Sequence, residues 1–217
     1  MSVYIGLVHY PVLNKAQERV SASISNLDIH DIARAAKTYG AKSYYIIHSE
    51  PGQKKLLDTI KAFWENPELP YNPMRSEALE IIKQCDTIED TINEITTQEA
   101  MRPVIVTTTA RKMPEQIPFG YLRILRQSRR PVLILFGTGY GLCDEVHHLA
   151  DHILEPILGE GVYNHLSVRS AVSVVLDRIS SEYIYGRNHG YSAHSWQRPN
   201  QNRLSRISRR RYGEGPL

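Results

Sequence analysis

The sequence predicts an α/β fold, with a mostly parallel sheet and helices on both of its faces. Short apolar runs with the length of buried strands recur along the chain, and helix-like segments separate them. The run at 131–136 is continuously apolar, which is typical of a strand buried on both faces. Glycine-rich loops follow two apolar runs, at 137–141 and 159–161. Because ligands bind beyond the carboxyl ends of parallel strands, these loops indicate a pocket for a nucleotide-like molecule.

The composition is that of a globular protein. The chain has 217 residues, of which 41% are hydrophobic and 23% charged, enough for one sizeable core and one appended element. Its apolar runs stop well short of the ~20 residues that a bilayer span needs. We expect no membrane contact and no signal peptide. Cys85 and Cys143 do not make a disulfide framework, so a cytoplasmic location is expected.

Positive charge is concentrated at the end of the chain. Seven of the 26 basic residues but only one of the 23 acidic ones fall in 186–217, so this part carries about +6 and the rest about −3. We therefore expect a domain at 1–184 and a basic tail at 185–217 that is flexible without a partner. Arginines interleaved with tyrosine and tryptophan suit RNA, although a solubility role is the alternative. The expected RNA-binding tail residues are Arg206, Arg209, Arg210 and Arg211.

The first half of the chain reads as alternating strands and helices. A strand is expected at 3–8, followed by a polar loop at 14–25. The segment 26–40 has its apolar residues on one helical face, with Asn26 or Asp28 able to cap its start and Gly40 at its C′ position. His30, Arg34 and Lys37 form a polar stripe, which by itself reads as a solvated face. Next come a strand at 43–48, helices at 54–64 and 75–80, and an ambiguous segment at 81–85.

The second half continues the same alternation. Thr87 and Asp90 resemble a capping box that opens a helix running to about Ala100. A β-branched strand follows at 104–109, and hydroxyls and an arginine gather at its carboxyl end. The remaining elements are expected to be a helix at 119–126, a strand at 131–136, a helix at 141–150, an apolar strand at 153–158 and a helix at 169–180.

Three segments together resemble the SpoU-like branch of the SPOUT superfamily of RNA methyltransferases. Asn26–Gly40 looks like the first SpoU motif, Leu133–Leu142 like the second, and Tyr163–Ala171 like the third. Thr108–Arg111 also resembles a loop of one SpoU-like branch. The order and spacing of the segments carry the resemblance, which covers 3–184. The chain looks closest to a small bacterial subfamily described as S-adenosylmethionine-dependent RNA methyltransferases.

The resemblance implies a fold and a cofactor. SPOUT enzymes tie their C-terminal part into a deep trefoil knot, an exception to the rule that chains do not thread loops. The knot holds S-adenosylmethionine bent between loops, and such enzymes are typically homodimers that share the active site. On this resemblance, the cofactor-binding residues are Thr108, Phe136, Gly137, Gly139, Leu142, Ile157, Leu158, Gly161, Leu166 and Ser167.

The resemblance also assigns residues to the reaction with RNA, for which tRNA and rRNA are the expected substrates. Arg34 would contact phosphate and stabilise developing charge, since a guanidinium stays protonated and is a poor base. Asn26 would brace the start of the helix or touch the substrate. His165 could accept a proton. Lys37 and Arg111 would join Arg34 in binding RNA.

The second and third motifs depart from the usual SpoU pattern. The loop at 137–141 has no acidic residue, and His165-Leu166-Ser167 stands where the family has Ser-Leu-Asn. Methylation of a ribose 2′-hydroxyl and of a base nitrogen therefore both stay open. The missing acid also motivates an alternative from another class, a non-catalytic RNA-binding protein, such as a ribosome-assembly factor, on a SPOUT scaffold.

Two further site types fit the sequence less well. The loop at 137–141 could bind NAD, with Glu155 near the place of a ribose-binding acid, but its Gly-x-Gly-x-Gly pattern and late position do not fit the Rossmann fingerprint. His147, His148, Asp151 and His152 could suggest a metal, but surface histidines explain this cluster better, and no metal is expected. Cys143 is expected to be a small buried residue.

Overall fold

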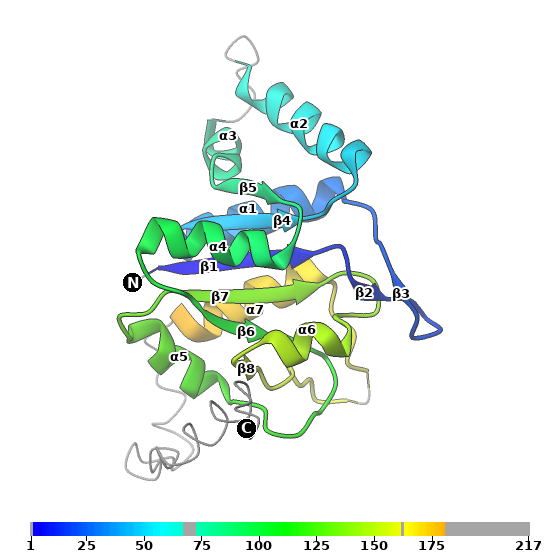
Figure 1. The fold of residues 1–217 in the computed structure, drawn as a ribbon, viewed down its shortest axis with the longest axis vertical. Helices are drawn as coiled ribbons and strands as arrows, with labels where there is room; N and C mark the ends of the chain where they lie inside the picture. Colours follow the sequence, from blue (N-terminus) through cyan, green and yellow to red (C-terminus); the bar gives the residue numbers. More distant parts are fainter. Residues whose placement is uncertain (1, 67–72, 162, 181–217) are drawn as a thin grey trace, which may run out of the picture. The chain divides into compact units, whose positions relative to one another are not determined.

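A parallel sheet of six strands forms the centre of the protein (Figure 1). The structure is a computed structural model, and it describes residues 2–66, 73–161 and 163–180. The strands lie in the order β5-β4-β1-β7-β6-β8, and each neighbouring pair is parallel. Their bounds are β1 Val3–Val8, β4 Ser43–Ile47, β5 Ile82–Cys85, β6 Val104–Thr107, β7 Val132–Gly137 and β8 His152–Ile153. The predicted α/β fold with a mostly parallel sheet is confirmed.

Helices cover both faces of this sheet. Residues of α1, α3, α5 and α7 join the core on one face, and those of α4 and α6 join the core on the other. Figure 1 shows α4 and α6 in front of the sheet, with α1 and α7 behind it. The helices are α1 Asn26–Thr38, α2 Pro51–Glu65, α3 Pro73–Leu79, α4 Ile88–Glu99, α5 Phe119–Gln127, α6 Asp144–Leu149 and α7 Val168–Ser180.

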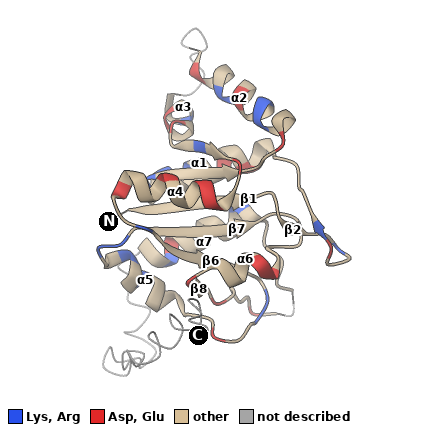
Figure 2. Ribbon diagram, in the orientation of Figure 1, with Lys and Arg blue, Asp and Glu red and all other residues tan. Residues whose placement is uncertain are grey.

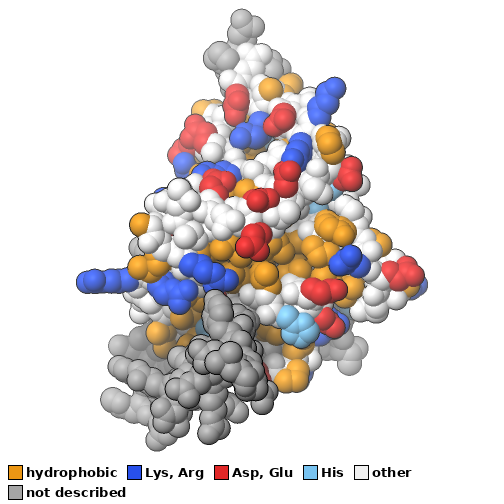
Figure 3. Space-filling view, in the orientation of Figure 1, with side chains coloured by type: hydrophobic (Ala, Val, Ile, Leu, Met, Phe, Trp, Pro, Cys, Tyr) orange, Lys and Arg blue, Asp and Glu red, His pale blue; other side chains and the backbone are white. Residues whose placement is uncertain are grey.

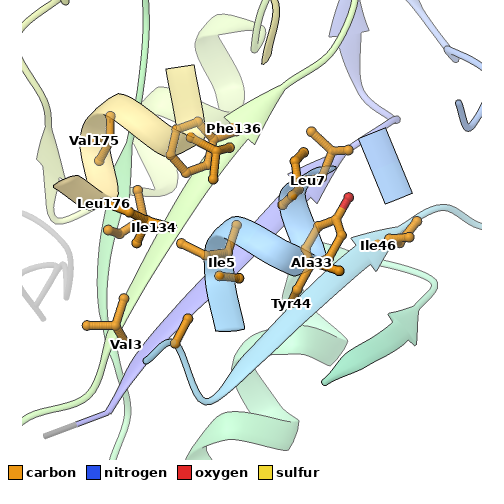
Figure 4. Packing of buried hydrophobic residues seen from close by; sticks show 14 of the residues in the cluster. Val3, Ile5, Leu7, Ala33, Tyr44, Ile46, Ile134, Phe136, Val175 and Leu176 are labelled. Atoms are coloured by element: carbon orange, nitrogen blue, oxygen red, sulfur yellow. The ribbon is translucent and has the colours of Figure 1, made fainter. Parts of the chain in front are cut away.

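The alternation of side chains along β1 explains how one strand serves two cores. Val3, Ile5 and Leu7 enter the core under α1 and α7, whereas Tyr4 and Val8 enter the other one. Figure 4 shows the first of these cores, with residues of β1, β4, β7, α1 and α7 packed together. Every residue of β1 is buried, as expected for a central parallel strand.

Two helix ends agree with the expected capping chemistry. Gly40 has φ +72°, and its N–H donates to the Lys37 carbonyl while that of Ala41 donates to the Ala36 carbonyl. This pair of bonds is a Schellman motif. Thr87 and Asp90 form the predicted capping box at the start of α4.

Some local expectations were wrong. A small hairpin joins β2 (Val12–Leu13) to β3 (Arg19–Val20), and β3 falls inside the segment 14–25 that was predicted to be a loop. The apolar run at 153–158 is a strand only as far as Ile153. Ser25, rather than Asn26 or Asp28, is the N-cap of α1. His30 is buried against Trp64, with ring centroids 5.4 Å apart, so it does not belong to a solvated stripe.

The compact unit that the structure describes ends at Ser180. The predicted domain boundary at 184 lies outside the described residues and stays a prediction. The tail arginines predicted to bind RNA lie outside the described residues. Within the described part of the chain, none of the helices has the length and hydropathy needed to cross a membrane.

Candidate functional site

The glycine-rich loop lies at the point where the strand order reverses. From β1 the chain moves outward to β4 and β5, whereas β7, β6 and β8 lie on the other side. In open α/β sheets, ligands bind at such a switch point, beyond the carboxyl ends of the strands. Thr138, which follows β7, donates both its N–H and its hydroxyl to the carbonyl of Val8 at the end of β1, at 3.2 and 3.1 Å. The loop is thus tied across the switch point.

The same loop folds tightly onto itself and onto the β2–β3 hairpin. The Tyr140 N–H donates to the Leu13 carbonyl, and the Leu13 N–H donates to the Gly141 carbonyl, each at 2.9 Å. A Cβ added to Gly137 would lie 2.6 Å from the backbone nitrogen of Leu142. One added to Gly139 would lie 2.9 Å from the Leu13 carbonyl oxygen, and φ there is +58°. These contacts explain why glycine is needed in this loop.

The loop after β6 is hydrogen-bonded to the segment that follows β8. The N–H of Glu155 donates to the Ile117 carbonyl at 2.9 Å, and the Gln116 side-chain amide donates to the Leu154 carbonyl at 3.2 Å. Asn164 donates to the Ala110 carbonyl at 3.3 Å. The Glu155 carboxylate accepts from the N–H of Phe119 at 2.8 Å, so it caps the start of α5. Hydrogen bonds therefore join the 108–118 loop to the 154–167 segment.

The predicted cofactor residues lie in these loops but in different environments. Phe136 and Leu142 are each 1% exposed, so their side chains are packed inside the protein. Thr108 is held to β7, because its N–H and its hydroxyl donate to the Leu135 carbonyl. Ser167 caps α7: its hydroxyl accepts from the Ser170 N–H at 3.4 Å.

The segment after β8 offers apolar surface for a cofactor. Leu158 and Leu166 are 57% and 51% exposed, while Ile157 packs partly against the core. A Cβ on Gly161 would meet nothing within 4 Å. Exposed apolar side chains beside open backbone are the surfaces that an adenosyl group needs for its faces and edges. The residues present therefore fit S-adenosylmethionine.

Predicted RNA contacts lie mainly on α1, which carries both acidic and basic residues (Figure 2). The Arg34 side chain is 53% exposed, and its Nη2 lies 2.5 Å from Oδ1 of Asp31. Lys37 pairs with Glu77 at 3.1 Å. Asn26 is exposed at the first position of the helix. These side chains leave the apolar face of α1 free to pack on the sheet.

The remaining predicted residues lie on the loops. Arg111 pairs with Asp144 at 3.7 Å. His165 is exposed, and its ring lies edge-on to that of Tyr163, with centroids 5.4 Å apart.

Three acidic and basic groups of this region were missed as functional candidates. Arg169, in the first turn of α7, bonds Asp28 of α1 at 3.2 Å and lies 3.6 Å from Asp31. The i, i+3 spacing of Asp31 and Arg34 was visible in the sequence. The contact of Arg169 was not, because it joins residues more than 130 positions apart.

Two buried histidines at the switch edge were also missed. His9 and His48 follow β1 and β4, and their rings stack with centroids 5.5 Å apart. Burial, then the nearby charge of His48, lowers the pKa of His9 to about 4. Burial also lowers the pKa of His48. Both rings are therefore neutral at pH 7.

This pair makes the fold sensitive to acid. Because the folded-state pKa of His9 lies below its ordinary value of 6.5, the unfolded chain takes up the proton first as the pH falls. We expect stability to be complete above pH 6.5 and to fall by up to about 3 kcal/mol towards pH 4. Urea unfolding at several pH values measures this change. His9→Asn should fall less steeply, and identical slopes in both proteins would contradict the assignment.

The histidine cluster of α6 and β8 is only partly at the surface. His147 is 4% exposed, and its Nδ1 lies 2.9 Å from the Thr107 hydroxyl, so the surface explanation was wrong for this residue. Burial lowers the pKa values of His147 and His152. Among the described residues, no three His, Cys, Asp or Glu side chains are grouped to hold a metal ion. Cys143 is buried, as predicted.

A family described as SAM-dependent RNA methyltransferase matches residues 2–181. The chain belongs to this family. The match covers α1, the glycine-rich loop and the third motif together, and it confirms the predicted family of S-adenosylmethionine-dependent RNA methyltransferases. The family does not favour the dinucleotide-binding alternative or the non-catalytic scaffold.

Two relatives show how far this family membership extends. An uncharacterized protein of Aquifex aeolicus is 37% identical over 182 residues, which are 83% of this chain and 89% of that protein. A tRNA (guanine-N(1)-)-methyltransferase of Oleidesulfovibrio alaskensis is 40% identical over 179 residues, which are 82% of this chain and 42% of that protein. The chain thus spans less than half the length of this second relative.

Solved structures of methyltransferases share the fold. A probable methylase family protein from Haemophilus influenzae superposes with a TM-score of 0.57 at 15% identity, covering 94% of this chain and 75% of that one. The SpoU methyltransferase AviRb from Streptomyces viridochromogenes gives 0.51 at 15% identity, covering 82% and 58%. At these identities the likeness concerns the fold.

Proposed function

We propose that this protein transfers a methyl group from S-adenosylmethionine to an RNA, with tRNA as the substrate class. The observation that carries the proposal is the family match over 2–181, which includes every loop of the candidate site. The relative from Oleidesulfovibrio alaskensis, named for tRNA, supports the substrate class. Its guanine N1 specificity is not transferred, because that name describes a protein more than twice as long as the matched segment.

The loops suit the cofactor through backbone groups and a few apolar side chains. Backbone of 137–142 and Thr108 would bind the polar edges, and Leu158 and Leu166 would cover the apolar faces. When bound, the cofactor supplies a methyl group already activated on a sulfonium. The protein then has to align the RNA nucleophile and exclude water.

Electrostatics favours the α1 side as the RNA surface. Arg34 would bind phosphate, and Lys37 lies one turn further along the same helix. By contrast, α4 carries four acids and no Lys or Arg, as Figure 2 shows, so it would repel RNA. Asn26 and His165 are proposed to touch the substrate, and the tail arginines to add phosphate contacts.

We also propose the trefoil knot. Support comes from hydrogen bonds of the 108–118 loop to Leu154, Glu155 and Asn164. These three residues belong to the segment that leads from β8 to α7. An experimental structure in which 154–167 does not pass through a closed loop of the chain would contradict this topology.

The proposed enzyme is a cytoplasmic homodimer. Figure 3 shows apolar side chains gathered between α4 and α6 on one face, where Ile88, Leu149 and Ala150 are only partly buried. Tyr163 of the third motif is 76% exposed. Such surfaces suit contact with a second copy. Light scattering should give twice the mass of one chain, and a monomer at micromolar concentration would contradict the homodimer.

Calorimetric titration of the purified protein with S-adenosylmethionine tests the function. We expect saturable binding, no binding of NADH as the control, and transfer of a labelled methyl group to total tRNA. Binding without transfer to tRNA or rRNA would support the non-catalytic scaffold instead. Binding of NADH alone would overturn the cofactor assignment.

A further inference from the structure

Four charged side chains form one network of contacts between α7 and α1. Arg169 of α7 places Nη1 3.2 Å from Oδ1 of Asp28 and Nε 3.6 Å from Oδ2 of Asp31. The other oxygen of Asp31 lies 2.5 Å from Nη2 of Arg34. Asp31 is therefore shared between two guanidinium groups, one from each helix.

Within this network, the exposure of the side chains falls from Arg34 towards Asp28. The side chains of Asp28, Arg169 and Arg34 are 12%, 34% and 53% exposed, respectively. A nearly buried carboxylate is a firm anchor, because leaving it without its partner is costly. Arg34 is the exposed end. Holding an exposed arginine in one orientation costs side-chain entropy, so a fixed partner favours that orientation.

The position of Arg169 connects this network of charged side chains with the cofactor loops. Arg169 is the second residue of α7, two positions after the N-cap Ser167 and three after the exposed Leu166. Any shift of the 163–167 loop that moves the start of α7 therefore moves the partner of Asp31. Arg34 lies in the third turn of α1, and Asp31 connects its guanidinium to Arg169 at the start of α7.

We propose that Arg169 is a positioning residue: through Asp31 it orients the Arg34 guanidinium for the RNA phosphate and links that orientation to the third-motif loop. The inference rests on the proposed function. Asp28 anchors Arg169, and Asp31 transmits the position to Arg34. Arg169 itself touches neither RNA nor cofactor.

A simple structural tie between the helices makes a different prediction. If Arg169 only ties the helices together, breaking its contacts lowers stability, and breaking another polar contact between the same helices has the same effect. The protein offers a matched control, because Asp177 of α7 accepts a hydrogen bond at 3.2 Å from the hydroxyl of Tyr39, the C-cap of α1. This contact lies two turns away from Arg169 along α7. Asp177→Ala breaks a polar contact of the same helix pair without touching Arg34.

The first readout is the Nε–H signal of Arg34 in heteronuclear NMR spectra, identified by its loss in Arg34→Lys. We expect Arg169→Met and Asp31→Asn to shift and broaden this signal, Arg169→Lys to do so less, and Asp177→Ala to leave it unchanged. This readout needs no catalysis. An unchanged Arg34 signal in Arg169→Met would overturn the inference even if the protein is an active enzyme.

The second readout is the rate of methyl transfer. Arg169→Met should lower kcat about tenfold through misplacement of Arg34, with the KM for RNA and the cofactor affinity nearly unchanged. The melting temperature should also fall, because Asp28 loses its partner. Arg169→Lys should recover part of the rate. A loss confined to melting temperature, or equal losses in Asp177→Ala, would reduce Arg169 to a structural tie. Failure of the proposed function would appear instead as absent transfer in the unmodified protein, with the Arg34 signal still responding to Arg169.

Discussion

Replacing Arg34 by alanine is expected to reduce methyl transfer at least about a hundredfold, because a charge that stabilises the reacting RNA is removed. Cofactor affinity should not change, since the cofactor loops follow β6, β7 and β8 rather than α1. The fold should also survive. Ile29, Ile32, Ala33 and Ala36 carry the buried face of α1, whereas the Arg34 side chain is 53% exposed.

Arg102→Ala is the matched control for this variant. The Arg102 side chain is 48% exposed and lies 3.6 Å from Asp151, so the change removes a similar surface ion pair just before the amino end of β6. Transfer assays and calorimetric titration of both variants separate chemistry from binding. Full activity in Arg34→Ala would remove this residue from the site, and an equal loss in Arg102→Ala would point to a general charge effect.

Replacing Gly137 by alanine should damage both the fold and the cofactor site. Its Cβ would lie 2.6 Å from the Leu142 nitrogen and 2.8 Å from the Gly141 carbonyl carbon. Both are backbone atoms, so relief requires movement of the whole loop rather than rotation of a side chain. We expect a loss of at least about 2 kcal/mol in the free energy of unfolding. Because the loop also binds Leu13 and Val8, its displacement should abolish cofactor binding.

Gly120→Ala makes the same chemical change in an open place. Gly120 lies in α5, and its added Cβ meets nothing within 4 Å. Alanine should leave stability unchanged or raise it slightly, since it favours helix more than glycine does. Denaturant unfolding and cofactor titration of both variants measure the contrast. Equal stability of Gly137→Ala and the unmodified protein would show that the loop has more freedom than these contacts allow.

Local chemistry alone determined much of the architecture. The β1 strand, the α1 helix with its Gly40 terminus, and the Thr87–Asp90 capping box followed from apolar periodicity and from residues a few positions apart. The same holds for the glycine-rich loop after β7, because tight turns need glycine wherever they occur. The order of three motifs also sufficed to indicate the family. Each of these features depends on residues that are close together in the sequence, so the sequence alone predicts it.

Only the tertiary structure decided which side chains are available at the site. The side chain of Phe136, a predicted cofactor-binding residue, is buried between β7 and α7 (Figure 4). The β3 strand was predicted to be part of a loop, because the hairpin is held by bonds between Leu13 and the distant glycine-rich loop. Arg169 contacts Asp28 and Asp31 because α7 lies beside α1 in the folded protein. These contacts join distant parts of the chain, so burial and charge pairing there depend on how the sheet brings its helices together.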